Sequence, residues 1–238
     1  MALSSLRSYN SESGNILIYV LGAIVLLGIL ISVVRGTGSS GNNIQEEELM
    51  IRIAEIQEYG HELEKAIAFI LRKNYSEADI RFAHPEADAG YGDITDNPDR
   101  QVFSIDGGAA TYREIPRGIQ TATGGDWVFT GANRVHDVGT TDSGTGNDHN
   151  AELIAILPNV TEVFCLRMND TNDVVNPSDS PPQDNGSASF DFYTGLFSQT
   201  EDINDTSGDL DGVLEGCFEG GGTPAAGTFH YFRVLLPR

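Results

Sequence analysis

The sequence has few basic residues. It contains 14 Lys or Arg against 35 Asp or Glu, which gives a formal net charge of −21. The imbalance is concentrated in residues 76–238, where 8 basic residues stand against 27 acidic ones. Such a surface repels phosphate groups and anionic lipid, and we therefore exclude nucleic acid as a partner. Solubility accounts for the charge, and specific cation binding is the alternative.

The sequence also lacks the motifs of the common enzyme classes. Its five histidines form no HExxH and no close His/Cys set, and it has no Walker-type or dinucleotide-binding glycine loop. His136, Asp137 and Ser143 have the residue types of a catalytic triad, but no GxSxG nucleophile elbow accompanies them. We therefore expect a protein that is not an enzyme.

One long apolar run lies near the N-terminus. Residues 16–34 read ILIYVLGAIVLLGILISVV, 19 residues without a charge. As a helix this run spans about 28 Å, close to the hydrocarbon thickness of a bilayer. A cleaved secretory signal is the rival interpretation, but its apolar core would be unusually long, and no small-x-small site follows Ser32. We predict a leader over residues 1–14 and a single-pass transmembrane anchor over residues 15–35, with the acidic bulk of the chain outside the cytoplasm.

Cysteine is scarce. The chain has only Cys165 and Cys217, and neither lies in a CxxC pair, which argues against zinc or redox chemistry. Because an even number of cysteines in an exported domain is typical of disulfides, we predict a Cys165–Cys217 bond. Closing a loop of about 52 residues, it would stabilise the fold by roughly 4 kcal/mol in the chain-entropy account. The alternative is a pair of buried free thiols.

A flexible linker, GTGSSGNN at residues 36–43, precedes a predicted amphipathic helix over residues 44–75. Acidic residues begin this helix and basic residues end it, as the helix dipole favours. Its apolar residues recur at spacings of four and three, with Gly60 as the one gap; this helix seam consists of Leu49, Ile53, Ile56, Leu63, Ile67 and Ile70. The seam packs on the sheet of its own domain, against other copies of the chain, or both. His61 is expected to be a surface or satisfied side chain.

Residues 76–238 alternate short apolar segments with Gly-, Asp- and Pro-rich turns, which is typical of antiparallel sheets. Strands are expected at 101–105, 111–115, 127–130, 134–138, 190–197 and 228–236, the last with the clearest alternation. Residues 151–157 and 160–168 are predicted as two short helical turns, broken at Pro158. One long helix followed by an antiparallel sheet makes the fold class α+β.

An acidic run near residues 202–212 offers several oxygen ligands in a short loop, as calcium requires. The candidate ligands are Asp202, Asn204, Asp205, Asp209 and Asp211. Their spacing does not match an EF-hand, because no glycine stands sixth and no glutamate stands twelfth from Asp202. The run is therefore either a calcium site or a solvated acidic loop.

An anchor, a long amphipathic helix and a β-rich domain with one late disulfide resemble the plan of type IV pilins and type II secretion pseudopilins. The most local match is the glycine directly before the apolar run, in Ser13-Gly14-Asn15-Ile16. The resemblance implies that prepilin peptidase cuts between Gly14 and Asn15 and that the new N-terminus is methylated. It also implies a single-pass inner-membrane protein whose C-terminal domain is periplasmic or extracellular. Some pseudopilins hold calcium in this late region.

Three segments are similar to a group of uncharacterised pilin-like proteins of alphaproteobacteria. They are GNILIYVLGAIVLLGILI at the start, WVFTG…VGTTDSG…AELIAILPNVTEVFCLRMND in the middle and GCFEGG…GTFHYFRVLLPR at the end. The acidic residue that the family has at the fifth mature position is replaced here by Tyr19. That difference favours a minor or pseudopilin-like subunit, or a stand-alone anchored protein, over an abundant pilus subunit.

We therefore expect a structural pilin-like or pseudopilin-like subunit of a surface filament or a secretion-type apparatus. Its expected partners are the membrane, prepilin peptidase and other pilin-like subunits that contact the helix seam. The alternative is a stand-alone, membrane-anchored periplasmic binding protein with acidic, calcium-binding loops. No other cofactor is expected.

Overall fold

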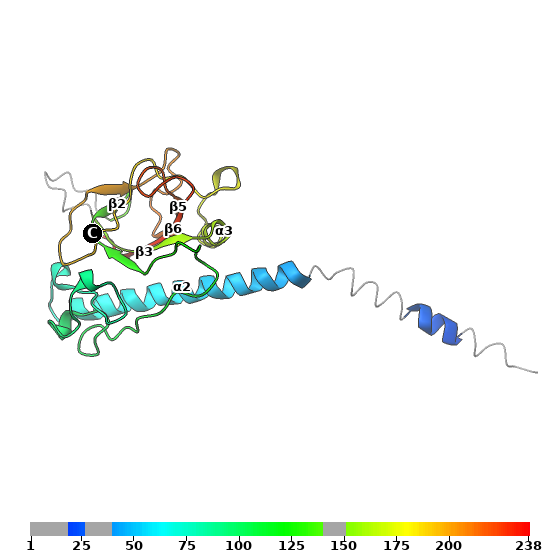
Figure 1. The fold of residues 1–238 in the computed structure, drawn as a ribbon, viewed down its shortest axis with the longest axis horizontal. Helices are drawn as coiled ribbons and strands as arrows, with labels where there is room; N and C mark the ends of the chain where they lie inside the picture. Colours follow the sequence, from blue (N-terminus) through cyan, green and yellow to red (C-terminus); the bar gives the residue numbers. More distant parts are fainter. Residues whose placement is uncertain (1–18, 27–39, 140–150) are drawn as a thin grey trace, which may run out of the picture. The chain divides into compact units, whose positions relative to one another are not determined.

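The computed structural model describes residues 19–26, 40–139 and 151–238 (Figure 1). It divides into two compact units, Met1–Glu48 and Leu49–Arg238. In the first unit, residues 19–26 are helical. Among the described residues, no helix is both long and apolar enough to cross a bilayer. Most of the predicted anchor at 15–35 and all of the leader at 1–14 lie outside the described residues.

The second unit is built on a four-stranded antiparallel sheet in the order β1-β3-β6-β5. Its strands are β1 (Val128–Thr130), β3 (Leu153–Val160), β5 (Glu215–Glu219) and β6 (Phe229–Leu236). A smaller parallel pair consists of β2 (Asn133–Val135) and β4 (Glu201–Ile203). Helix α2 (Ser40–Arg72) enters this unit at Leu49, and α3 (Glu162–Thr171) lies within it. Short 3-10 helices lie at Glu77–Asp79, Ala89–Tyr91, Pro98–Arg100 and Pro177–Asp179. The predicted α+β class with an antiparallel sheet is confirmed.

The long helix α2 packs along one face of the four-stranded sheet (Figure 1). Its seam residues from Ile53 onward are buried in one cluster with sheet residues such as Leu153 and Tyr231. Leu49, at the start of the seam, is only partly buried. The interpretation in which the seam packs on its own domain is therefore confirmed from Ile53 to Ile70.

The helix begins four residues earlier than predicted, at Ser40, so the linker prediction for 36–43 is wrong over residues 40–43. Ser, Gly and Asn have modest helix propensities, but adding a residue to an existing helix costs little compared with starting one. Residues 36–39 lie outside the described residues.

The predicted alternation of the last strand is confirmed in β6. Tyr231 and Leu235 lie in the cluster beneath α2, whereas Phe232 and Val234 lie in a second cluster on the opposite face. That second cluster is completed by residues such as Val135 of β2. A strand presents successive side chains to opposite faces, so β6 contributes to both halves of the core.

The helical prediction for residues 151–157 is wrong, because residues from Leu153 onward form β3, one of the two interior strands of the sheet. A short, continuous apolar run fits a buried helix and a buried strand equally well, and here both faces of β3 are covered. Pro158 lies where the β3–β6 register shifts between Leu157 and Val160, a place where a strand tolerates a residue without an N–H. The second predicted turn, at 160–168, overlaps α3.

Residues 101–105, 111–115 and 190–197 form no strand. They are held by side-chain packing together with single backbone hydrogen bonds, such as the one from the Tyr193 N–H to the Phe129 carbonyl. Phe103, for example, packs among the rings of Phe82, Tyr112 and Phe129. The sequence pattern identified apolar segments correctly, but it did not distinguish ladder hydrogen bonds from aromatic packing. It also gave no indication of β5.

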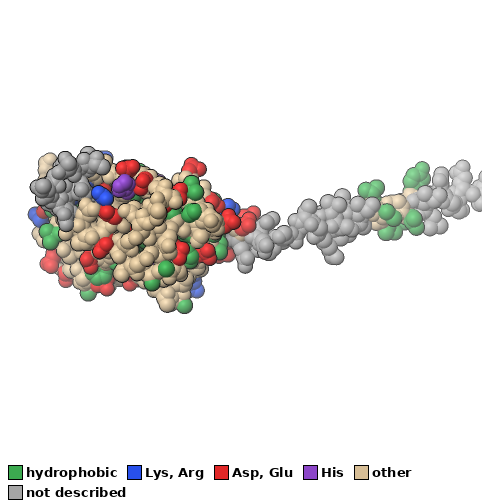
Figure 2. Space-filling view, turned by 90° about the horizontal axis from the view of Figure 1, so that it is seen from above, with side chains coloured by type: hydrophobic (Ala, Val, Ile, Leu, Met, Phe, Trp, Pro, Cys, Tyr) green, Lys and Arg blue, Asp and Glu red, His purple; other side chains and the backbone are tan. Residues whose placement is uncertain are grey.

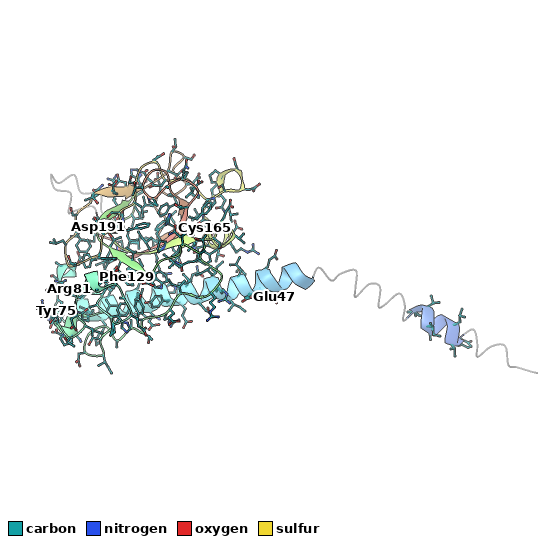
Figure 3. All side chains as sticks on the ribbon, viewed as in Figure 1. Glu47, Tyr75, Arg81, Phe129, Cys165 and Asp191 are labelled. Atoms are coloured by element: carbon teal, nitrogen blue, oxygen red, sulfur yellow. The ribbon has the colours of Figure 1, made fainter. Side chains whose placement is uncertain are left out.

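The predicted Cys165–Cys217 disulfide is wrong, since both residues are buried free thiols. Cys165 lies on α3 (Figure 3) and Cys217 on β5. The two elements are joined by Asn169, whose side-chain amide accepts from the Cys217 N–H at 2.7 Å and donates to the Cys217 carbonyl at 3.1 Å. Burial raises the pKa of both thiols, which keeps them protonated.

Candidate functional site

The predicted acidic ligands do not converge on one point. Asp202 lies on β4 and forms an ion pair with Arg134 at 2.9 Å. The carboxylate of Asp205 accepts from the backbone N–H groups of Ser207 and Leu210, so it shapes its own loop. The backbone N–H of Asn204 donates to Asp184. Asp209 and Asp211 follow in the same loop.

Asp211 meets two residues that the acidic-loop prediction did not include. Its carboxylate lies 3.1 Å from His136 Nδ1, and Asp137 lies 3.9 Å from the same nitrogen. A backbone hydrogen bond of 2.7 Å from Gly212 to the His136 carbonyl holds the two segments together. Ligand atoms of these three exposed side chains lie within 4.8 Å of one another, which makes this the candidate metal centre among the described residues.

One imidazole and two carboxylates suit a borderline transition metal such as zinc better than calcium, which prefers oxygen ligands alone. The fold brings the three residues together, because His136 follows β2 directly and Asp211 lies in the loop after β4, the strand that pairs with β2. Ser143, the third member of the triad considered from the sequence, lies outside the described residues.

Two buried carboxyls flank the β2–β4 pair. Glu152 accepts from the Val135 N–H at 2.8 Å, and burial raises its pKa to about 7. Burial also raises the pKa of Asp184, to about 6, and its Oδ2 has no hydrogen-bond partner in the described part of the chain. The negative charge of Asp202 adds to both shifts. The raised pKa values bring the change of protonation state of both carboxyls close to neutral pH, where a carboxyl with its ordinary pKa is fully ionised.

A buried arginine connects α2 to the sheet. Arg233 on β6 is 5% exposed, and its guanidinium donates to Glu64 at 2.8 Å and to Glu215 at 2.9 Å. The guanidinium also lies 2.8 Å from His61 Nδ1, and the same nitrogen lies 3.3 Å from the Glu64 carboxylate. Glu215 in turn accepts from the Tyr231 hydroxyl.

Arg233 and its partners Glu64 and Glu215 line a hollow of about 700 Å³, together with residues such as Leu214 and Pro237. The guanidinium donors already have acceptors, so the network fastens α2 to the sheet and leaves no free cation for a ligand. His61 is a surface side chain, as expected, but it also takes part in this junction. The sequence signals were the Gly60 gap in the seam and an arginine at an inward-facing position of β6.

The predicted processing site at Gly14 and Asn15 lies outside the described residues. Acidic side chains are scattered over the visible face of the second unit, with few basic ones between them (Figure 2). Comparisons of the chain with known protein families, curated proteins and solved structures find no match.

Proposed function

We propose that this protein is a structural pilin-like or pseudopilin-like subunit of a surface filament or a secretion-type apparatus, and not an enzyme. In this proposal an anchor at residues 15–35 holds it in the inner membrane, and the domain of residues 76–238 is periplasmic or extracellular. The observation that supports the proposal is the order of the elements: a 33-residue helix precedes an α+β domain and packs its seam on that domain's antiparallel sheet.

Contacts with other subunits require a surface that the domain does not cover. The seam is buried from Ile53 onward, whereas Met50 and Ile51 are 39% and 60% exposed. Exposed apolar residues on a helix suit lateral packing against other apolar helices. We therefore place the contacts with other subunits on α2 before Ile53.

Processing is the test that discriminates best. Co-expression with a prepilin peptidase should yield a chain whose N-terminal sequence begins at Asn15, and Gly14→Ala should abolish the cut. Gly22→Ala is the matched control, because it alters a glycine inside the apolar run and should leave cleavage unchanged. Full-length protein in every case would refute the pilin-like proposal.

The alternative is a stand-alone, membrane-anchored periplasmic binding protein with acidic, calcium-binding loops. The convergence of Asp211 on His136 and Asp137 favours metal binding by these loops, although the imidazole suits zinc better than calcium. Thermal unfolding should be measured with calcium and with zinc, for the natural protein and for Asp211→Asn. Stabilisation that Asp211→Asn removes would support metal binding, and an unchanged melting temperature at millimolar calcium would remove the calcium proposal.

A further inference from the structure

A groove is lined by the irregular segment of residues 185–191 and by residues 199–204, which include strand β4. It consists of two hollows of about 460 and 280 Å³, both of which are lined by Ser187, Thr200 and Glu201. Residues Thr223 and Pro224 complete the larger hollow. We call this feature the polar groove; Asp191 in Figure 3 marks its position.

Both walls of the polar groove are fixed to the turn that joins β1 and β2. The N–H groups of Thr200 and Glu201 donate to the Ala132 carbonyl. On the other wall, the Asn133 side chain donates to the Ser189 carbonyl at 2.8 Å and accepts from the Ser189 N–H at 2.6 Å. Because Asn133 is fully buried, the distance between the walls is set by the core. The groove is therefore preformed, which lowers the entropic cost of binding.

The lining of the polar groove is rich in hydrogen-bonding groups. Hydroxyl, amide and carboxylate side chains dominate, and no Lys or Arg is among the described residues that line it. Hydroxyls and amides both donate and accept, whereas carboxylates only accept. A complementary ligand must therefore present many donors and acceptors close together and carry no negative charge.

The groove also has a small apolar part, formed by Phe190 and Pro224. The Phe190 ring is held by an edge-to-face contact with His230, with 5.2 Å between ring centroids. A fixed aromatic ring beside polar groups suits a ligand that is polar at its edges and apolar on one face. The pyranose ring of a sugar has these properties.

We propose that the polar groove binds a neutral oligosaccharide. Asp202 is not available to a cationic ligand, because it is already paired with Arg134 at 2.9 Å and accepts from Gln199 at 2.6 Å. Asp191 and Glu201 remain, and the spermine and calcium arms of the experiment test whether they bind a cation. An anionic ligand is disfavoured, because the negative charges of Asp191 and Glu201 would repel it. The proposal does not depend on the filament function, since it concerns a site within the second unit alone.

The test is binding by the full-length chain in a zwitterionic, sugar-free detergent. Saturation-transfer NMR and calorimetry are run with cellotetraose, mannotetraose and chitotetraose, and with spermine, calcium and inorganic phosphate in separate arms. Binding of at least one neutral tetrasaccharide is expected, with no binding of phosphate. Failure of all three sugars to bind, or binding of spermine or calcium alone at this groove, overturns the proposal.

Two variants locate the site. Ser187→Trp places a bulky ring where the two hollows meet, and it should weaken sugar binding by about tenfold or more. Glu201→Gln removes a charge and keeps the shape, so it should weaken sugar binding only slightly, whereas a cationic ligand would lose affinity strongly. Glu114→Gln is the charge-matched control on an exposed residue outside the groove. Sugar binding that Ser187→Trp leaves unchanged in a folded protein would contradict the assignment.

Discussion

Gly60 on α2 provides the space that the Arg233 side chain occupies. A Cβ at residue 60 would lie 2.3 Å from Arg233 Cδ, which is far closer than a real contact. Arg233 cannot easily move away, because Glu64 and Glu215 both hold its guanidinium in a buried position. The gap in the helix seam is therefore filled by a side chain from the sheet.

We predict that Gly60→Ala destabilises the second unit by about 1–3 kcal/mol, because it displaces Arg233 from its carboxylate partners. Alanine in place of a helical glycine ordinarily stabilises by about 0.5–1 kcal/mol, so the sign of the effect is diagnostic. Urea unfolding measures the change. In an Arg233→Ala background, which removes Cδ and the guanidinium, the penalty should largely disappear, and an unchanged penalty there would show that Arg233 is not its cause.

Asn169 should be a strong determinant of stability, because its amide serves both backbone groups of Cys217 on β5. Asn169→Ala leaves a buried N–H and a buried carbonyl without these partners, and we expect a loss of about 2–4 kcal/mol in the free energy of unfolding. Asn169→Asp keeps the acceptor and loses the donor. Chemical denaturation should place it between the natural protein and Asn169→Ala, and equal stability of all three would contradict this assignment.

The free thiols give a direct chemical test. In denaturant without reductant, two thiols per chain should react with a thiol reagent. In the folded protein almost none should react, because Cys165 and Cys217 are both buried. A thiol-specific chromogenic reagent counts them. Reductant should leave the melting temperature unchanged, and a marked decrease would instead indicate a bond between these residues.

Glu152 should make stability depend on pH near neutrality. Its pKa rises from 4.5 to about 7 on burial, so between these values the folded state binds more protons than the unfolded state. The free energy of unfolding should therefore fall as pH rises from about 5 to 8, with a contribution of about 1–3 kcal/mol from this group.

The measurement for this prediction is urea unfolding at several pH values. Glu152→Gln keeps an acceptor for the Val135 N–H and removes the titration, so its stability should depend less on pH than that of the natural protein. Glu114→Gln, on an exposed residue, is the control and should retain the natural slope. Parallel pH profiles for all three proteins would contradict the assignment to Glu152.

The sequence alone determined the elements whose pattern is both long and periodic. The α2 seam repeats at helical spacing over several turns, which fits only a helix. Strand β6 alternates through Tyr231, Phe232, Arg233 and Val234, which fits only a strand. The acidic character of the domain also follows directly from composition. The candidate metal ligand Asp211 was identified, but its neighbours were not, since they depend on how β2 pairs with β4.

Tertiary structure decided the rest, because the deciding interactions join residues far apart in the chain. The apolar run from Leu153 becomes a strand because β1 and β6 flank it and both of its faces are covered. The cysteines remain thiols in a junction that Asn169 holds by hydrogen bonds. In the sequence, Gly60 is a gap in the apolar seam of the helix. Only the fold shows that the Arg233 side chain fills this gap, because the contact depends on how α2 packs against β6.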